Sequence, residues 1–411
     1  MPIKTQENTQ EFAVFLNLEL GSFNLSAGDI EMLYFIEDIF SFSMVGQLIF
    51  NDHKGILEFG PFTGNETITI IYGQDNDIIK TFNVLKISSI TQQGQTKGYS
   101  KSSIELFFVD PMYIVLTNYQ FSKSWKNQKI SKIINDISTN FLGVETWGEV
   151  EETKEELEYF YLPQTWKLNT SISWLLKRAS GLESGQPGFC YFTNSKGMNL
   201  VTLEKLLSQK KLMTISDDDS GVYVFEDINP YLYNKILSWK ISGSSMNTLD
   251  IMSGGVRFGY NSHEKNLIKN EYEYRDIIKD HTILGKHALF PNISESRMKH
   301  INYGETNTEL IDNITKSSWI KQYNKQQMIS IICRGNEERY AGGMIHINWP
   351  SDNDDEIYNK GRSGKYLIKS ITHSFNGNRP NHYSQNIVLI KNGYEEIDMK
   401  LLEKSTKKNL G

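Results

Sequence analysis

The chain has 411 residues, a formal net charge of -6 and 39% hydrophobic residues, so it can bury cores and is not wholly disordered. Its 9 prolines exclude a collagen-like chain, and its 49 acidic against 43 basic residues argue against a protein that binds nucleic acid. The length exceeds what one core usually organises, which predicts two or three domains.

The first predicted domain covers residues 1–117 and consists of antiparallel strands. The predicted strands are residues 12–18, 30–42, 44–50, 66–72 and 103–109. In the last of them Ile104, Leu106 and Phe108 fall on one face, as expected for a strand with one buried side. Several such strands indicate a sandwich or small barrel, and Pro111 marks its end because proline cannot donate into a ladder.

The second predicted domain covers residues 118–228 and is mixed α/β. Isoleucines at helical spacing predict one helix. They are Ile130, Ile133, Ile134 and Ile137. Asn169 or Thr170 is expected to cap a second helix, and Gly181 is expected to end it.

Two further features belong to this middle region. A hairpin is predicted with strands at residues 189–193 and 198–203. The acid-rich stretch 151–158 is interpreted as a solvated loop or helix face rather than as an acidic binding site.

The third predicted domain covers residues 229–395 and is again built from strands. Its predicted strands are residues 236–241, 327–334, 343–349, 365–375 and 385–391. A polar insertion at about 262–325 contains a predicted helix from about residue 308 to residue 323, and residues 396–411 predict a frayed tail. The expected fold class is therefore mainly β, with an α+β middle region.

The two cysteines and the N-terminus bear on the compartment. Cys190 and Cys333 both lie in apolar strand patterns, so we expect two small core residues in a reducing compartment and no disulfide. The first residues lack the apolar stretch of a secretion signal, and no segment is apolar enough to span a membrane as a helix. We therefore expect a protein made and folded in a cytoplasm.

The sequence contains no recognisable catalytic motif. No pair of the 8 histidines has the His-Glu-x-x-His spacing, and neither a Gly-x-Ser-x-Gly elbow nor a P-loop is present. His346 and His373 fall in predicted strands, where we expect hydrogen-bonded structural histidines. The glycine-rich run 254–259 is interpreted as a tight turn between strands. We therefore predict no catalytic, cofactor-binding or metal-binding residue, no cofactor, and a protein that is not an enzyme.

Two acidic runs were weighed as cation sites. The run 352–356 fails the EF-hand pattern because Ile357 stands where glycine is required and Ser363 where glutamate is required. We interpret it as a solvated hairpin loop, with a casual cation site as the alternative, and the run 217–221 as a turn. Paired carboxylates for glycoside hydrolysis cannot be selected among 49 acids by sequence alone.

Three segments, in this order, give the chain a resemblance to a known family. The first comprises residues 36–43, 46–52, 64–70 and 82–87, the second Leu162-Pro163-Gln164-Thr165-Trp166 with residues 172–179, 189–192 and 197–200, and the third residues 363–375 and 383–390. Together they resemble the central hub proteins of contractile-tail baseplates, which include the myophage hub and the hub portion of type VI secretion spike proteins.

The resemblance implies a fold, an assembly and a location. It implies two β-barrel tube domains per chain, a mixed α/β domain and an insertion. Three chains would form a ring that adapts a six-fold tail tube to a three-fold central spike. The chain would be a structural protein of the virion tail baseplate, assembled in the host cytoplasm, with no catalytic residues of its own.

The same resemblance implies partners. They are two further copies of the chain, the central spike protein below, and the tail tube or its initiator proteins above, with the tape measure protein and the baseplate wedge as further candidates. DNA would pass through the lumen without specific binding, which suits the mild negative charge. No membrane segment is implied.

Two other function classes remain as alternatives. A β-rich receptor- or glycan-binding tail module would use some of the 12% aromatic residues for stacking on sugars, although the same residues also fill strand cores. A tail-associated peptidoglycan hydrolase of unfamiliar type is the third reading, and a cell-wall clearing assay would separate it from the hub.

Overall fold

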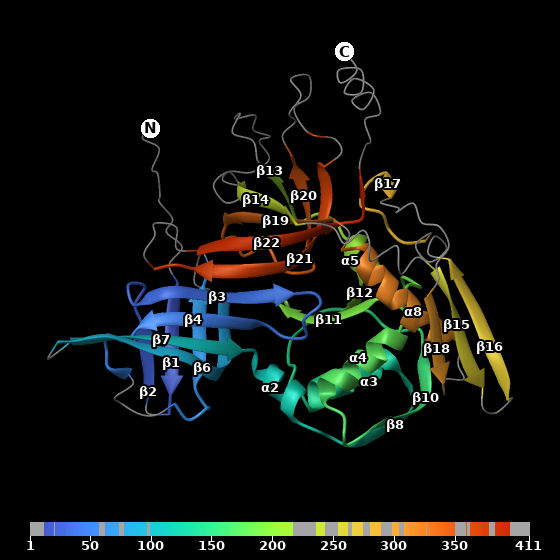
Figure 1. Cartoon of the computed structure of the whole chain (residues 1–411), viewed down its shortest axis with the longest axis horizontal. Helices are drawn as coiled ribbons and strands as arrows, with labels where there is room; N and C mark the ends of the chain where they lie inside the picture. The colour runs from blue at the N-terminus through green and yellow to red at the C-terminus, as the bar shows by residue number, and fades with distance from the viewer. Residues whose placement is uncertain are drawn as a thin grey trace, which may run out of the picture.

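The computed structural model describes most of the chain, and every structural statement below concerns these residues. They are residues 12–19, 21–56, 62–73, 78–96, 99–216, 236–242, 254–261, 265–273, 280–288, 298–303, 308–325, 327–349, 359, 362–377 and 383–394. The runs 217–221 and 352–356, two of the acidic features of the sequence, lie outside them. The fold is mainly β, with a mixed α/β middle region, as predicted (Figure 1).

One large sheet organises the molecule. Its strands follow the order β14-β19-β22-β21-β3-β4-β7-β6-β5-β1-β2, and β20 and β13 are attached beside β21. The N-terminal strands are β1 (Ala13–Leu18), β2 (Gly21–Leu25), β3 (Ile30–Asp38), β4 (Val45–Asn51), β5 (Thr67–Tyr72), β6 (Ile78–Thr96) and β7 (Tyr99–Val109). The C-terminal strands are β13 (Met213–Ser216), β14 (Ile236–Ser242), β19 (Gln327–Arg334), β20 (Met344–Asn348), β21 (Gly364–Phe375) and β22 (Tyr383–Lys391).

The N-terminal strands curl around a core of their own, which we call the first β block (β1 to β7). In β5 every second residue is buried, so Ile68, Ile70 and Tyr72 point inward as the alternation predicted. They pack with Leu48 of β4 and Phe108 of β7. Antiparallel pairing of β4 with both β3 and β7 holds the inward faces in register.

The first β block and the C-terminal strands share the sheet because β3 pairs with β21 in antiparallel fashion. In Figure 1, β22, β21, β3 and β4 lie side by side in that order. Phe375 of β21 and Tyr383 of β22 are buried in the core of the first β block. Closure of each half into a separate barrel, and the domain boundaries at residues 117, 228 and 395, stay predictions.

The middle region packs three helices and two small sheets around a second core (Figure 1). Its helices are α2 (Pro111–Asn118), α3 (Ile130–Asn140), α4 (Leu168–Arg178) and α5 (Leu203–Leu207), of which α5 packs elsewhere. Its strands are β8 (Lys123–Lys129), β9 (Trp147–Val150), β10 (Glu156–Leu162), β11 (Phe189–Asn194) and β12 (Gly197–Thr202). The predicted isoleucine helix and the predicted hairpin are both confirmed, since α3 buries its isoleucines and β11 pairs with β12.

Three predictions for this region were wrong in detail. Helix α4 begins at Leu168 with Lys167 as its N-cap, two or three residues before the expected caps. The helix ends at Arg178, and Gly181 instead lies against Glu151, whose carboxylate would sit 1.9 Å from an added Cβ atom. The acid-rich stretch is not simply solvated, because Glu151 and Glu155 are 1% and 7% exposed.

Described residues of the predicted insertion contribute strands and a helix at the side of the molecule (Figure 1). The strands β16 (Asn266–Glu273) and β18 (Met298–Tyr303) pair with β15 (Gly254–Asn261), which precedes the insertion, and the helix is α8 (Thr308–Tyr323). The short strand β17 (His287–Ala288) pairs with β23 (Gly393–Tyr394), which lies beyond the insertion. The helix confirms its predicted bounds and packs against α4. The glycine-rich run is not a tight turn, because it lies in β15, where alternation of Val256, Phe258 and Tyr260 favours extended backbone.

Within these described ranges, no helix combines the length and the apolar character that crossing a membrane requires.

Candidate functional site: a buried polar junction

Three distant segments meet at one buried carboxylate. Glu37 of β3 is fully buried, and its Oε2 atom accepts a hydrogen bond of 3.0 Å from the backbone nitrogen of Ala341. The backbone of Ser195, in the turn of the β11–β12 hairpin, also acts on this carboxylate and lowers its pKa. Asn194 of the same hairpin donates from its side-chain amide to the carbonyl of Ala341 at 2.8 Å. Glu37 therefore joins the first β block, the hairpin turn and the loop that precedes β20.

The second oxygen of Glu37 faces a buried histidine. Its Oε1 atom lies 3.6 Å from Nε2 of His373 on β21, too far for a normal hydrogen bond, and both side chains are at most 2% exposed. Neither of these two atoms has a hydrogen-bond partner among the described residues. The imidazole ring stacks on Phe35, with 4.4 Å between centroids, which fixes its position.

The histidine is the first member of a chain of polar contacts within the sheet. Its Nδ1 atom lies 2.7 Å from the hydroxyl oxygen of Tyr383, and that oxygen accepts a hydrogen bond from Nε2 of Gln385 at 2.8 Å. Gln385 in turn accepts a hydrogen bond of 3.0 Å from the guanidinium of Arg339, a fully buried cation. His373 therefore contacts Tyr383 through Nδ1, while its Nε2 atom faces Glu37 without a hydrogen bond.

Burial shifts the pKa values of both members of the pair toward their neutral forms. Removal from water raises the pKa of Glu37 from 4.5 to about 7, against the opposing effects of the Ala341 hydrogen bond and the charge of Lys80. Burial, together with the same lysine charge, lowers the pKa of His373 from 6.5 to about 3.

One partly buried cation, Lys80, acts on two carboxylates at this junction. Lys80 of β6 donates to the carbonyl of Asn194 at 3.4 Å. Its pKa is lowered by burial, while the charges of Glu37 and Asp110 act in the opposite direction. Asp110, which accepts from the backbone nitrogen of Met112 at the start of α2, has a pKa raised by burial and lowered by Lys80.

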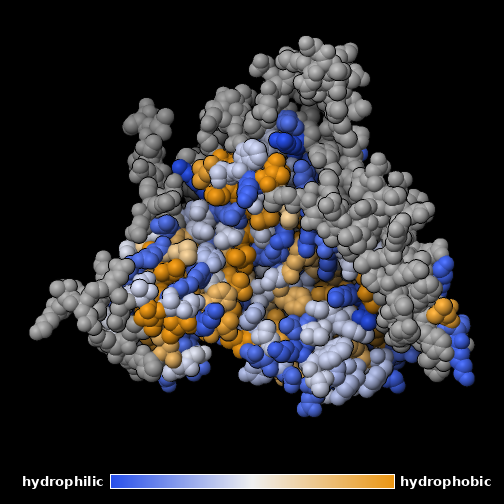
Figure 2. Space-filling view, viewed as in Figure 1, coloured by the Kyte–Doolittle hydropathy of each residue, from blue (hydrophilic) through white to orange (hydrophobic). Residues whose placement is uncertain are grey.

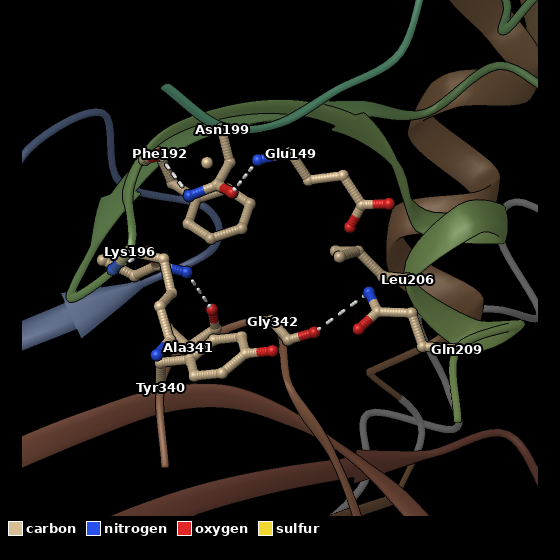
Figure 3. A pocket seen from close by; sticks show the side chains of 11 residues that line it. Glu149, Phe192, Lys196, Asn199, Leu206, Gln209, Tyr340, Ala341 and Gly342 are labelled. Carbon is tan, nitrogen blue, oxygen red and sulfur yellow. Dashed lines mark hydrogen bonds between the residues drawn. The ribbon is translucent and has the colours of Figure 1, made fainter. Parts of the chain in front are cut away.

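A small cavity lies beside this junction and shares Asn194 and Ala341 with it (Figure 3). It has a volume of about 260 Å³. Its lining residues are Gly148, Glu149, Phe192, Asn194, Lys196, Asn199, Leu206, Gln209, Tyr340, Ala341 and Gly342. The amide of Asn199 is committed internally, since its oxygen accepts from the backbone of Glu149 at 2.8 Å and its nitrogen donates to the carbonyl of Gly197 at 2.9 Å.

Other buried carboxylates have all their hydrogen bonds satisfied. Glu151 accepts four hydrogen bonds, from the backbone nitrogens and hydroxyls of Ser184 and Thr202. Glu155 accepts from Ser180 and from the amide of Asn313 on α8. These groups hold segments of the middle region together, whereas Glu37 and His373 each keep an unpaired atom.

The sequence predicted no site residue, but it placed His373 of the junction correctly, as a hydrogen-bonded strand histidine. Glu37 was overlooked, although a signal existed. Leu33, Phe35 and Glu37 alternate along β3 and are all buried, so the strand pattern alone placed a carboxylate on the inward face. A lone acid at an inward strand position is the feature that could have identified the junction.

The remaining candidate chemistry is structural. Cys190 on β11 and Cys333 on β19 are both buried in the core, as expected, and burial raises the pKa of the Cys190 thiol to about 11. His346 lies 3.0 Å from Asn348 within β20. In the part of the chain that the structure describes, no three His, Cys, Asp or Glu side chains gather as a metal site would require.

Comparison with known proteins bears on the fold as a whole. Neither a family model nor a curated protein matches the sequence. A tail protein from Neisseria meningitidis MC58 superposes with a TM-score of 0.60 at 10% identity, over 92% of this chain and 96% of that chain. The 43 kDa tail protein of prophage MuSo2 from Shewanella oneidensis gives a TM-score of 0.57 at 11% identity, over 92% and 98%.

The fold is that of phage tail proteins. The resemblance drawn from the sequence is thereby supported at the level of the fold, and the predicted mainly β class is confirmed. A structure of the Francisella PdpA–VgrG complex is also similar, with 14% identity, a TM-score of 0.48 and coverage of 94% of this chain and 54% of that chain.

Proposed function

We propose that the chain is a structural protein of a phage or phage-derived tail, and more specifically the central hub of its baseplate. The observation that carries this proposal is the end-to-end match of fold, which takes in more than nine tenths of this chain and of both tail proteins. Because the match covers both β blocks and the middle region together, a tail role accounts for more than nine tenths of the chain.

In this proposal three copies form a closed ring that adapts a six-fold tube to a three-fold spike. A heterologous contact that closes after three rotations gives a ring instead of a filament. The partners are then a spike protein on one side and tube proteins on the other, and the net charge of -6 favours passage of DNA without adhesion.

Half-exposed apolar side chains supply surface for contacts between copies. On β14, the terminal strand of the described sheet, Leu237, Trp239 and Ile241 are 52%, 46% and 42% exposed. A second group lies on β6, and Figure 2 shows apolar side chains gathered over the first β block. An apolar strand at the edge of a sheet favours burial against another chain.

We also propose that the hub has no catalytic activity. Glu37 and His373, whose pKa values are strongly perturbed, are buried away from solvent. Both groups lie where separate segments of the chain pack together, which indicates a structural role.

The test of this function is the mass of the purified chain by light scattering, with negative-stain images of the same peak. We expect three times the 47.4 kDa of one chain and a ring with a central hole. The variant Trp239→Lys should shift the mass toward one chain, whereas Lys240→Glu on the opposite face of β14 should leave it unchanged. A strictly monomeric protein that clears cell walls would contradict the proposal.

A further inference from the structure

We propose that Glu37 acts as a proton-controlled latch at the junction of three segments. In its protonated form it stays buried between β3, the hairpin turn 194–197 and the loop 335–343, and its ionisation favours opening of these segments because the charged carboxylate gains hydration in the open state. This inference concerns the junction within one chain and does not depend on formation of a ring.

Glu37 lies where a change in its charge affects contacts between segments that are distant in the sequence. Its carboxylate is fully buried and receives a backbone hydrogen bond from Ala341, whose carbonyl in turn accepts from Asn194 of the hairpin turn, so the group lies where the two segments meet β3. Both segments are far from β3 in the sequence, since Ala341 and Ser195 are separated from Glu37 by more than a hundred residues. A change at one carboxyl group therefore acts on long-range contacts.

The charges around Glu37 can compensate one buried carboxylate but not two. Lys80 from β6 acts on both Glu37 and Asp110, which precedes α2. When Glu37 is protonated, one cation faces one carboxylate. When Glu37 ionises, the same lysine faces two carboxylates, and an uncompensated charge on the fully buried Glu37 is costly.

The other groups that face the site do not relieve this imbalance. His373 from β21 lies 3.6 Å away and stays neutral, since burial lowers its pKa to about 3. Tyr383 from β22 also stays neutral because burial raises its pKa. The remaining cation, Arg339, is engaged by Gln385 and by the carbonyl of Arg334.

The unpaired atoms show where the junction has room to change. Glu37 Oε1 and His373 Nε2 face each other without a hydrogen bond, unlike Glu151, whose two oxygens accept four. A carboxyl proton on Oε1 would point at the free ring nitrogen and give this pair a donor. Because burial raises the pKa of Glu37 to about 7, the change of state falls near neutral pH.

The experiment compares the intact chain with Glu37→Gln, which keeps the shape and removes the titration. Hydrogen exchange of peptides that cover residues 194–197 and 335–343 is measured at pH 6 and pH 8 and corrected for intrinsic exchange. We expect the opening of these segments in the wild-type chain to increase by about tenfold, in line with the linkage of one proton over that interval. Glu37→Gln should show no such increase, and Glu158→Gln, at an exposed position, should behave as the wild type.

A second readout keeps the proposal testable if Glu37→Gln does not fold. The infrared band of a protonated carboxyl group, identified by its shift in heavy water, should be present in the wild-type chain at pH 6 and reduced at pH 8. Exchange that does not respond to pH in the wild type, a response retained in Glu37→Gln, or a band that does not change between the two pH values would each overturn the latch.

Discussion

At the scale of single residues, the molecule uses buried carboxylates in two ways. Glu151 and Glu155 are buried with hydrogen bonds to both oxygens, so their charge is well solvated by the protein. Glu37 is buried with one oxygen unpaired. A satisfied carboxylate stabilises the segments that it joins, and an unsatisfied one makes them sensitive to its protonation.

The first prediction concerns Glu151→Ala. Removal of this side chain leaves the buried donors of Thr202 and Ser184 without an acceptor, so we expect the free energy of unfolding to fall by about 3 kcal/mol. The control is Glu158→Ala from the same acid-rich stretch, where the side chain is exposed and stability should hardly change. Denaturant unfolding measures both, and equal effects of the two variants would contradict the assignment.

The second prediction is the pH dependence of Glu37→Gln. The folded-state pKa of Glu37 is raised from 4.5 to about 7, so the wild-type chain loses stability as pH rises through that interval. Relative to the wild type, the variant should gain up to about 3 kcal/mol at pH 8 and little below pH 4.5.

The stability that His373 contributes depends on pH in the opposite direction. Its folded-state pKa is lowered from 6.5 to about 3, so its contribution is present above pH 6.5 and is lost as pH falls toward 3. Between pH 4.5 and 6.5 the two slopes oppose each other in the wild type. The stability of Glu37→Gln should therefore rise with pH in that interval. Thermal unfolding of the variant in a pH series measures this, and a melting temperature that does not rise from pH 4.5 to pH 6.5 would contradict the prediction.

The residues of the junction were only partly predictable from sequence. The burial of Glu37 could be read from its inward strand position, and His373 was placed in a strand correctly. Their meeting could not be predicted, since it depends on pairing between β3 and β21, which lie some three hundred residues apart. The buried state of Glu151 was missed because charge runs are usually solvated and periodicity says nothing of hydrogen-bond donors from distant segments.

At the scale of elements, period-two patterns predicted many of the strands that bury one face, although β6, β8 and β10 were missed. The strands β5, β7, β19 and β22 agree with prediction for this reason, and α3 agrees because its isoleucines repeat at helical spacing. The glycine-rich β15 was mistaken for a turn because composition outweighed its alternation. Which strand pairs with which is a property of the folded chain that local periodicity does not encode.

The third prediction tests the sharing of a core between elements. Phe375 lies on β21 but packs in the core of the first β block, where its ring stacks on Tyr383 with 4.8 Å between centroids. We expect Phe375→Ala to lower the free energy of unfolding by about 4 kcal/mol and to weaken hydrogen-exchange protection in β5. The control Ile332→Ala removes a side chain that is 41% exposed on β19 and should cost far less. Undiminished protection in β5 would show that the core is not shared.

At the scale of the whole molecule, one sheet joins parts of the chain that the sequence analysis predicted to be separate domains. The first β block supplies β3, the C-terminal strands supply β21, and the middle region supplies the hairpin turn that reaches Glu37. Without the others, each part would expose an apolar strand edge or leave a buried polar group without a hydrogen bond. We therefore expect the parts to unfold as a single cooperative unit.

The fourth prediction follows from this coupling and tests the predicted boundary at residue 117. Residues 1–117 expressed alone lack Phe375 and Tyr383 from their core and leave the β3 edge unpaired. We expect this fragment to aggregate or to show no cooperative thermal transition, since an open apolar strand edge recruits other chains. Co-expression with residues 118–411 should restore a soluble complex, because it returns both the missing side chains and the partner strand. A fragment 1–117 that is soluble and monomeric and melts cooperatively would establish an independent domain and refute the coupling.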